Sequence, residues 1–154
     1  FFFGTKMTGS RAVVVKDVDV HKFIAAYAAY LKKAGKVEIP KYVDVIKLAH
    51  FKELAPRNAD WYYYRCAAIA RRLYVQPGIG VGAMQRVFGG KDRRGVRTGR
   101  FTKSSGGVIR HCVQQLEKMG IVEITPNGGR TLTKEGRRDL DRIAQQVLFP
   151  ELFE

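Results

Sequence analysis

The sequence predicts a mainly α-helical fold, in which a helical bundle surrounds a central helix and a winged-helix-like core carries one small β-hairpin. Apolar residues recur at helical spacing in several stretches of the chain. The last third reads as helix, glycine, hairpin and helix, which is the element order of a winged helix-turn-helix unit. With 154 residues, 45% of them hydrophobic, the chain is long enough to bury one domain core.

The first helix is predicted to follow Asp19, which can cap it, and to stop at Gly35. Its apolar residues recur at helical spacing, and two lysines near its end suit the negative end of the helix dipole. Between Pro40 and Pro56 we expect only a short element, a helical turn over residues 41–45.

The central helix is predicted over residues 61–75, because apolar side chains cover most of its circumference. It opens near residues 58–60, and Pro77 and Gly78 end it. A short helix is expected over residues 81–88. A helix that is apolar on most sides is expected to be buried.

Residues 91–103 are predicted to form a loop, since glycines interrupt them and no apolar period survives. A helix capped by Ser104 or Ser105 then runs to Gly120. Short strands at residues 121–124 and 130–132 are joined by a turn at residues 126–129, which would be the wing. The final helix is capped by Thr133 and continues through residue 147.

The net charge of the chain limits the classes of partner that it can bind. Lysine and arginine total 28 against 14 acids, giving a net charge of +14 and a pI near 10.1. Such a domain attracts polyanions, and nucleic acid is the first candidate because each neutralised phosphate releases counterions. An anionic membrane surface is the second candidate, and a basic protein without a charged partner is the third. No stretch has the length of a membrane-spanning helix.

The sequence predicts neither a metal site nor a catalytic site. Cys66 and Cys112 lie in apolar helical patterns and are expected to be buried free thiols. Three scattered histidines have no zinc-binding spacing to the cysteines. The acids are also scattered, and no nucleophile has a neighbouring acid–base set.

No cofactor is predicted, although Gly78, Gly80 and Ala83 match the relaxed dinucleotide fingerprint. That motif requires a strand before it and an acid about 20 residues later. Here a helix precedes the glycines and no acid lies at the expected distance, so we expect no small-molecule substrate. The glycines serve either tight packing of helices or close approach to an RNA backbone.

The predicted loop over residues 91–103 concentrates positive charge against the single acid Asp92. Such a loop cannot be buried, and arginine binds phosphate through several donors at once. Phe101 could stack on an unpaired base or pin the loop to the core. The candidate nucleic-acid-binding residues of this loop are Lys91, Arg93, Arg94, Arg97, Arg100, Phe101 and Lys103.

The central helix supplies further candidates. Trp61, Arg65 and Arg72 fall on one helical stripe, with Arg71 on its flank. The arginines either form structural ion pairs or bind a nucleic-acid backbone. On the later helix, Arg110 is a further candidate. It is one of the polar residues, with His111, Gln114 and Lys118, that point away from the core and would read DNA in a winged helix.

Seven segments of the chain resemble, in the same order, the archaeal and eukaryotic small-subunit ribosomal protein family numbered nineteen of the "e" type. They cover roughly residues 13–147. The segments are "VKDV" at Val15, "KELAP" at Lys52, "WYYYR" at Trp61, "ARRLY" at Ala70, "GIGVGAMQRVFGG" at Gly78, "QQLEKMGIVE" at Gln114 and "GGRTLTKEGRRDLDRIA" at Gly128. The chain departs from the family at both ends.

The resemblance implies a non-enzymatic protein in the head of the small (40S) ribosomal subunit that binds small-subunit ribosomal RNA and takes part in its maturation. It implies neighbouring 40S head proteins as partners, and a cytoplasmic location with nucleolar passage in a eukaryote. We expect a loose segment over residues 1–12, one RNA-binding domain over 13–147 and a tail over 148–154. The family's basic surface corresponds here to Trp61, Arg65, Arg71, Lys91, Arg93, Arg94, Arg97 and Arg110.

A winged-helix transcription regulator that binds DNA is the alternative. Basic residues spread over several segments favour RNA, because a DNA reader concentrates them on one recognition helix.

Overall fold

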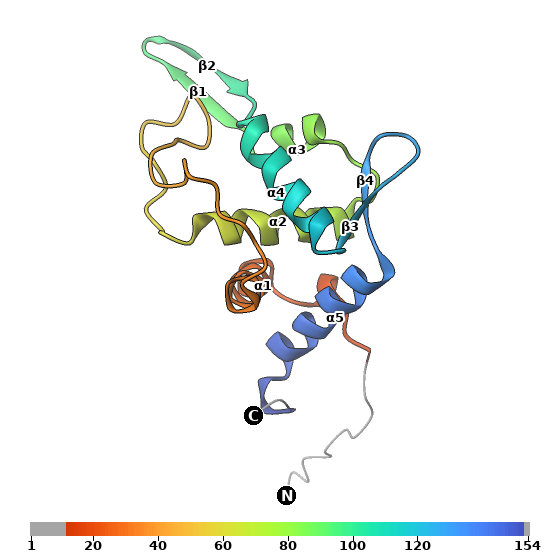
Figure 1. Cartoon of the computed structure of the whole chain (residues 1–154). Helices are drawn as coiled ribbons and strands as arrows, with labels where there is room; N and C mark the ends of the chain where they lie inside the picture. Colours follow the sequence, from red (N-terminus) through yellow and green to blue (C-terminus); the bar gives the residue numbers. More distant parts are fainter. Residues whose placement is uncertain (1–11, 153–154) are drawn as a thin grey trace, which may run out of the picture.

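The fold is mainly α-helical, as predicted, and is described by a computed structural model for residues 12–152 (Figure 1). The predicted loose segment over 1–12 and the last two residues of the tail lie almost wholly outside this range. In chain order the elements are α1 (Val20–Ala34), α2 (Trp61–Val75), α3 (Val81–Val87), β1 (Gly90–Arg94), β2 (Arg97–Thr102), α4 (Gly106–Lys118), β3 (Val122–Ile124), β4 (Arg130–Leu132) and α5 (Lys134–Leu148). Short 3₁₀ turns, Val15–Asp17 and Pro150–Leu152, flank them.

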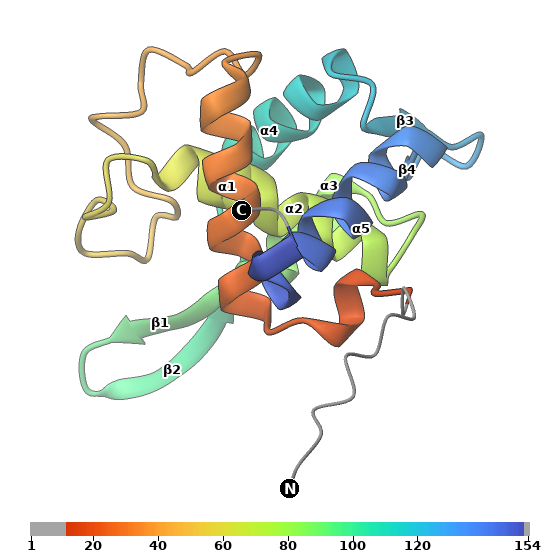
Figure 2. The same cartoon turned by 90° about the horizontal axis from the view of Figure 1, so that it is seen from below.

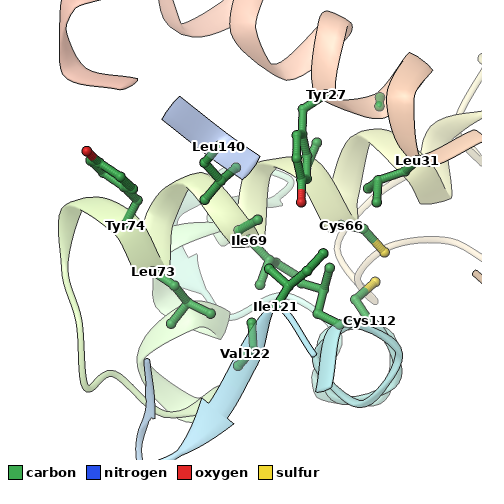
Figure 3. Close-up of a cluster of buried hydrophobic side chains, with 14 of the residues drawn as sticks. Tyr27, Leu31, Cys66, Ile69, Leu73, Tyr74, Cys112, Ile121, Val122 and Leu140 are labelled. Atoms are coloured by element: carbon green, nitrogen blue, oxygen red, sulfur yellow. The ribbon is translucent and has the colours of Figure 1, made fainter. Parts of the chain in front are cut away.

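Helix α2 is the centre of the fold, and α1, α4 and α5 pack around it (Figures 1 and 2). Figure 3 shows Tyr27 and Leu31 of α1 facing Cys66 and Ile69 of α2. Most of the α2 circumference is buried, as its apolar stripes predict. Burying a leucine or isoleucine side chain completely stabilises the fold by about 1.5–3 kcal/mol relative to leaving it exposed. This shared core therefore fixes the positions of the helices relative to one another.

The helix ends follow their sequence signals with two exceptions. Asp19 accepts a hydrogen bond from the amide of Lys22 and caps α1, and Thr133 caps α5 in the same way. Asp60 precedes α2 but makes no capping bond, and its carboxylate accepts a hydrogen bond from Lys32 of α1 at 3.0 Å instead. Ser105 precedes α4, and its side chain makes no capping bond either.

The predicted wing is present as the antiparallel pair β3–β4, in the register Val122 with Leu132 and Ile124 with Arg130. The backbone just before α3 pairs with β4 and so adds to the wing. Gly78 donates to the carbonyl of Arg130 at 2.9 Å, and Arg130 donates to the carbonyl of Ile79 at 3.0 Å. The start of the glycine-rich run therefore lies against the wing.

Residues 91–103 are not a loop, and that prediction was wrong. They form most of a second antiparallel hairpin, β1–β2, which projects from the body of the protein between α3 and α4 (Figures 1 and 2). Gly95 and Val96 make its two-residue turn. Gly95 has a φ of 71°, which suits the glycine-first turn favoured in hairpins. The prediction failed because this hairpin is solvated and lacks the apolar alternation of a half-buried strand.

Candidate RNA-binding surface

The β1–β2 hairpin and the residue that follows it carry five exposed cations. Lys91 lies opposite Phe101 and Asp92 opposite Arg100 in the ladder, so each pair shares one face of the ribbon. Within residues 12–152, none of the four salt bridges includes a hairpin residue. The hairpin therefore presents these charges to a partner instead of neutralising them internally. The exposed cations are Lys91, Arg93, Arg97, Arg100 and Lys103.

Arg94 is the exception, because its guanidinium is used within the hairpin. Between the pairs Asp92–Arg100 and Arg94–Arg97, one residue of β1 faces two of β2, which creates a bulge at Thr98. Arg94 donates to the Thr98 carbonyl from both Nε and Nη2. The Arg94 side chain therefore stabilises the bulge. The bulge in turn orients the neighbouring arginines of the hairpin.

Two apolar side chains on the hairpin remain in solvent. Phe101 is 62% exposed, although an edge of its ring lies against Gly89, where an added Cβ would come within 2.7 Å of Phe101 Cζ. Val96 is fully exposed at the turn. Phe101 is thus held at the foot of the hairpin with much of its ring free, so the geometry is compatible with both expected roles.

The foot of the hairpin is fixed to α3 and α4 by Gln85 and Ser104. Ser104 donates to the Gln85 carbonyl from its amide at 3.1 Å and from Oγ at 3.3 Å, and Gln85 Nε2 donates to the Ser104 carbonyl at 3.2 Å. Ser104 is buried, so these bonds are shielded from water. The hairpin is consequently a rigid extension of the helical body. Neither residue was predicted for this role from the sequence, because their pairing depends on the undetected hairpin.

The predicted residues of α2 divide into two groups. Trp61 is only 7% exposed and its Nε1 donates to the Val43 carbonyl at 3.1 Å, so it anchors the preceding loop and does not form part of the surface. Arg65 is half-buried, with its guanidinium carbon 4.2 Å from the centre of the Phe88 ring at the end of α3. Burial lowers the pKa of Arg65. Arg65 therefore lies beside the start of the hairpin.

Arg71 and Arg72 lie about two turns further along α2 and are also half-buried. Arg72 donates from Nη2 to Oε1 of Gln76 at 2.6 Å. Throughout residues 12–152, no carboxylate lies within 4.0 Å of Arg65, Arg71 or Arg72. Of the two roles left open for the α2 arginines, structural ion pairs are thus excluded in the described part of the chain.

Helix α4 offers fewer free polar groups than expected. Arg110 and Gln114 are exposed. His111 is half-buried and its Nδ1 is hydrogen-bonded to the hydroxyl of Tyr62. Lys118 lies 3.5 Å from the carboxylate of Glu38. Arg110 therefore stands as the one exposed cation in the first two turns of this helix.

Cys66 and Cys112 are free and buried, as predicted (Figure 3). A hydrogen bond with Cys112, together with burial, raises the pKa of the Cys66 thiol, so this thiol stays protonated. Within residues 12–152 no group of three metal-binding side chains occurs, and no helix there has the length and apolarity to cross a membrane.

The comparisons with known proteins agree on one family. The family described as Ribosomal protein S19e matches residues 14–149. The chain is 52% identical to small ribosomal subunit protein eS19 of Oryza sativa subsp. japonica over 141 residues, which are 92% of this chain and 97% of that protein. It is 50% identical to eS19A of Schizosaccharomyces pombe, over 90% of this chain and 96% of the relative. It is 54% identical to eS19G of Ascaris suum, over 89% and 93% respectively.

Proposed function

Because the chain belongs to the ribosomal protein S19e family, we propose that it is a structural constituent of the small ribosomal subunit and binds small-subunit ribosomal RNA. We place it in the head of that subunit, beside neighbouring head proteins, and assign it a part in RNA maturation and subunit assembly. It would work in cytoplasmic ribosomes after passing through the nucleolus of a eukaryotic cell.

The exposed, unpaired cations of the β1–β2 hairpin are the observation that supports this function most directly. Phosphates neutralised by Arg93, Arg97 and Arg100 release counterions, which drives binding without reading base sequence. The Gln85–Ser104 bonds hold the hairpin in place, so little conformational entropy is lost on binding. Folded RNA is then recognised by shape. Arg65, Arg71, Arg72 and Arg110 extend the proposed surface along α2 and α4.

The geometry of α4 counts against the alternative, a DNA-binding transcription regulator. Two of the four side chains that would read bases are engaged elsewhere, His111 by Tyr62 and Lys118 by Glu38. A winged helix that reads DNA presents its recognition helix with free polar side chains. The strongest basic feature is instead the hairpin inserted before that helix.

Cosedimentation with small ribosomal subunits in high salt tests the proposal. The chain should remain with the 40S particles, and it should bind small-subunit RNA more tightly than duplex DNA in a gel-shift assay. The triple variant Arg93→Ala, Arg97→Ala and Arg100→Ala should fold normally but bind RNA with a shallower salt dependence, by roughly one unit per lost contact. Equal or tighter binding to a defined DNA duplex would overturn the proposal.

A further inference from the structure

A groove of about 630 Å³ separates strand β1 from the loop that precedes α2. The loop wall consists of residues 47–53 and the strand wall of residues 91–93. The two walls are some forty positions apart in the sequence, and the loop wall contains none of the residues that the sequence predicts to bind RNA.

The loop wall is fixed in place. The amide of Ser105, just before α4, donates to the Leu48 carbonyl at 2.9 Å. Ala49 is buried, and the ring of Phe51 packs so closely on Gly90 that a Cβ there would lie 3.1 Å from ring carbons. The groove is therefore a feature of the fold and does not depend on a chance position of an irregular segment.

Cationic residues of both walls line this groove. Lys47 and Lys52 come from the loop, and Lys91 and Arg93 come from the strand. All four are exposed, and none forms a salt bridge within residues 12–152. Lys52 Nζ lies 5.1 Å from the centre of the Phe51 ring, which holds the ammonium group over the loop wall.

Two carboxylates also line the groove, Glu53 and Asp92, so the four cations leave a net charge of +2 with His50 neutral. Like charges held together without counterions destabilise one another, and a chain of phosphates relieves that repulsion. These two carboxylates would repel nearby phosphates, which restricts the path that an RNA backbone can take through the groove.

We propose that this groove binds a segment of RNA phosphodiester backbone, with Lys47 and Lys52 on one side and Lys91 and Arg93 on the other. The inference deepens the proposed ribosomal RNA function and rests on it. It adds a second wall to the hairpin surface, so that the RNA strand is held from two sides. Glu53 weakens this binding by repulsion.

Binding of labelled small-subunit head RNA, measured at several salt concentrations, tests the groove. The double variant Lys47→Ala, Lys52→Ala should bind about tenfold more weakly at physiological salt, with a salt slope smaller by roughly one to two units. Glu53→Gln should bind about two- to threefold more tightly, a gain that misfolding cannot produce. Lys16→Ala removes an exposed cation on the 3₁₀ turn that packs on α5, and should leave affinity and slope unchanged.

The outcomes separate the two proposals. If the wild-type chain fails to bind the RNA, both fall. If the hairpin triple variant loses affinity while the Lys47/Lys52 double variant and Glu53→Gln match the wild type, the groove assignment alone is overturned. If the double variant binds RNA normally but no longer cosediments with 40S particles, the groove holds an acidic protein neighbour, and the RNA assignment is again overturned.

Discussion

Arg94 donates two hydrogen bonds to one acceptor, the carbonyl oxygen of Thr98, from Nε at 3.1 Å and from Nη2 at 2.8 Å. The side chain of its neighbour Arg93 is exposed and has no hydrogen-bond or salt-bridge partner within residues 12–152. Two adjacent arginines of the same strand therefore have different roles, since one shapes the bulge and the other remains free to bind phosphate.

Substituting these two arginines separately should distinguish the residue that stabilises the hairpin from the residue that binds RNA. Arg94→Ala should speed amide hydrogen exchange in β1 and β2 by about thirtyfold, because it removes two bonds that hold the bulge, each worth about 1 kcal/mol. Arg93→Ala should leave that exchange unchanged and lower RNA affinity. The assignment of roles would be reversed if Arg93→Ala loosened the hairpin while Arg94→Ala did not.

Gly136 and Gly107 offer a matched pair in the first turns of α5 and α4. A Cβ at Gly136 would lie 2.4 Å from the backbone carbonyl oxygen of Ile121, whereas a Cβ at Gly107 meets nothing within 4 Å. Gly136→Ala should therefore lower the free energy of unfolding by about 1–3 kcal/mol, since Ile121, just before β3, must move away from α5. Gly107→Ala should leave it unchanged or raise it by up to about 1 kcal/mol.

Thermal melting measured by circular dichroism would compare these two variants with the wild type. For a chain of this size, each kcal/mol corresponds to roughly 2–4 °C in Tm. Equal melting temperatures for Gly136→Ala and Gly107→Ala would contradict the close contact between α5 and the backbone at Ile121.

The central helix and the wing were predictable because each depends on local pattern. The stripes of α2 repeat at 3.6 residues, and the wing has short apolar strands around a glycine-containing turn. The β1–β2 hairpin lacks both signals, because its strands consist mainly of arginine, lysine, threonine and glycine and neither face is buried. Its one local cue is the pair Gly95–Val96 between charged runs, which fits a two-residue turn.

The candidate surface was harder to predict than the fold. The cations of residues 91–103 were recognised from charge alone, but the sequence does not reveal that Arg94 binds the Thr98 carbonyl or that Trp61 is buried against Val43. Lys47 and Lys52 were not predicted to bind RNA, because their loop is brought beside β1 only by tertiary contacts, the hydrogen bond between Ser105 and Leu48 and the packing of Phe51 on Gly90. Such long-range contacts leave no periodic trace in the sequence.

The pair Tyr62 and His111 should make stability depend on pH. Burial, followed by the charge of nearby Lys118, lowers the pKa of His111, while Glu38 opposes this shift. An unfolded histidine titrates near 6.5, so the unfolded chain binds the proton first as pH falls. The stabilising contribution of neutral His111 is present above about pH 6.5 and is lost as pH drops through the lower folded-state pKa.

Urea unfolding between pH 7.5 and pH 5 would measure this dependence. His111→Gln keeps an acceptor for the Tyr62 hydroxyl but cannot titrate, so its stability should fall less steeply than that of the wild type. His21→Gln, which removes an exposed histidine of α1, serves as the control and should follow the wild-type curve. Identical slopes for wild type and His111→Gln would refute the linkage.

Arg65 should reveal a conflict between stability and RNA binding. Its Nη1 is buried without a hydrogen-bond partner in the described part of the chain, and its guanidinium lies over Phe88. Burying an unpaired polar group opposes folding, so we expect Arg65 to serve RNA binding more than stability. Arg65→Met removes the charge, while the thioether can still contact the Phe88 ring.

Arg65→Met should therefore leave the free energy of unfolding unchanged or raise it by up to about 1 kcal/mol, and should weaken RNA binding several-fold. Arg65→Lys keeps a positive charge at the same position and should retain most of the affinity, which separates charge from side-chain volume. Chemical unfolding and RNA titrations on the same three proteins would decide the matter. A methionine variant that unfolds at lower denaturant concentration but binds RNA normally would show that Arg65 serves the fold alone, because stability would have fallen where no loss is expected and affinity would be unchanged where a loss is expected.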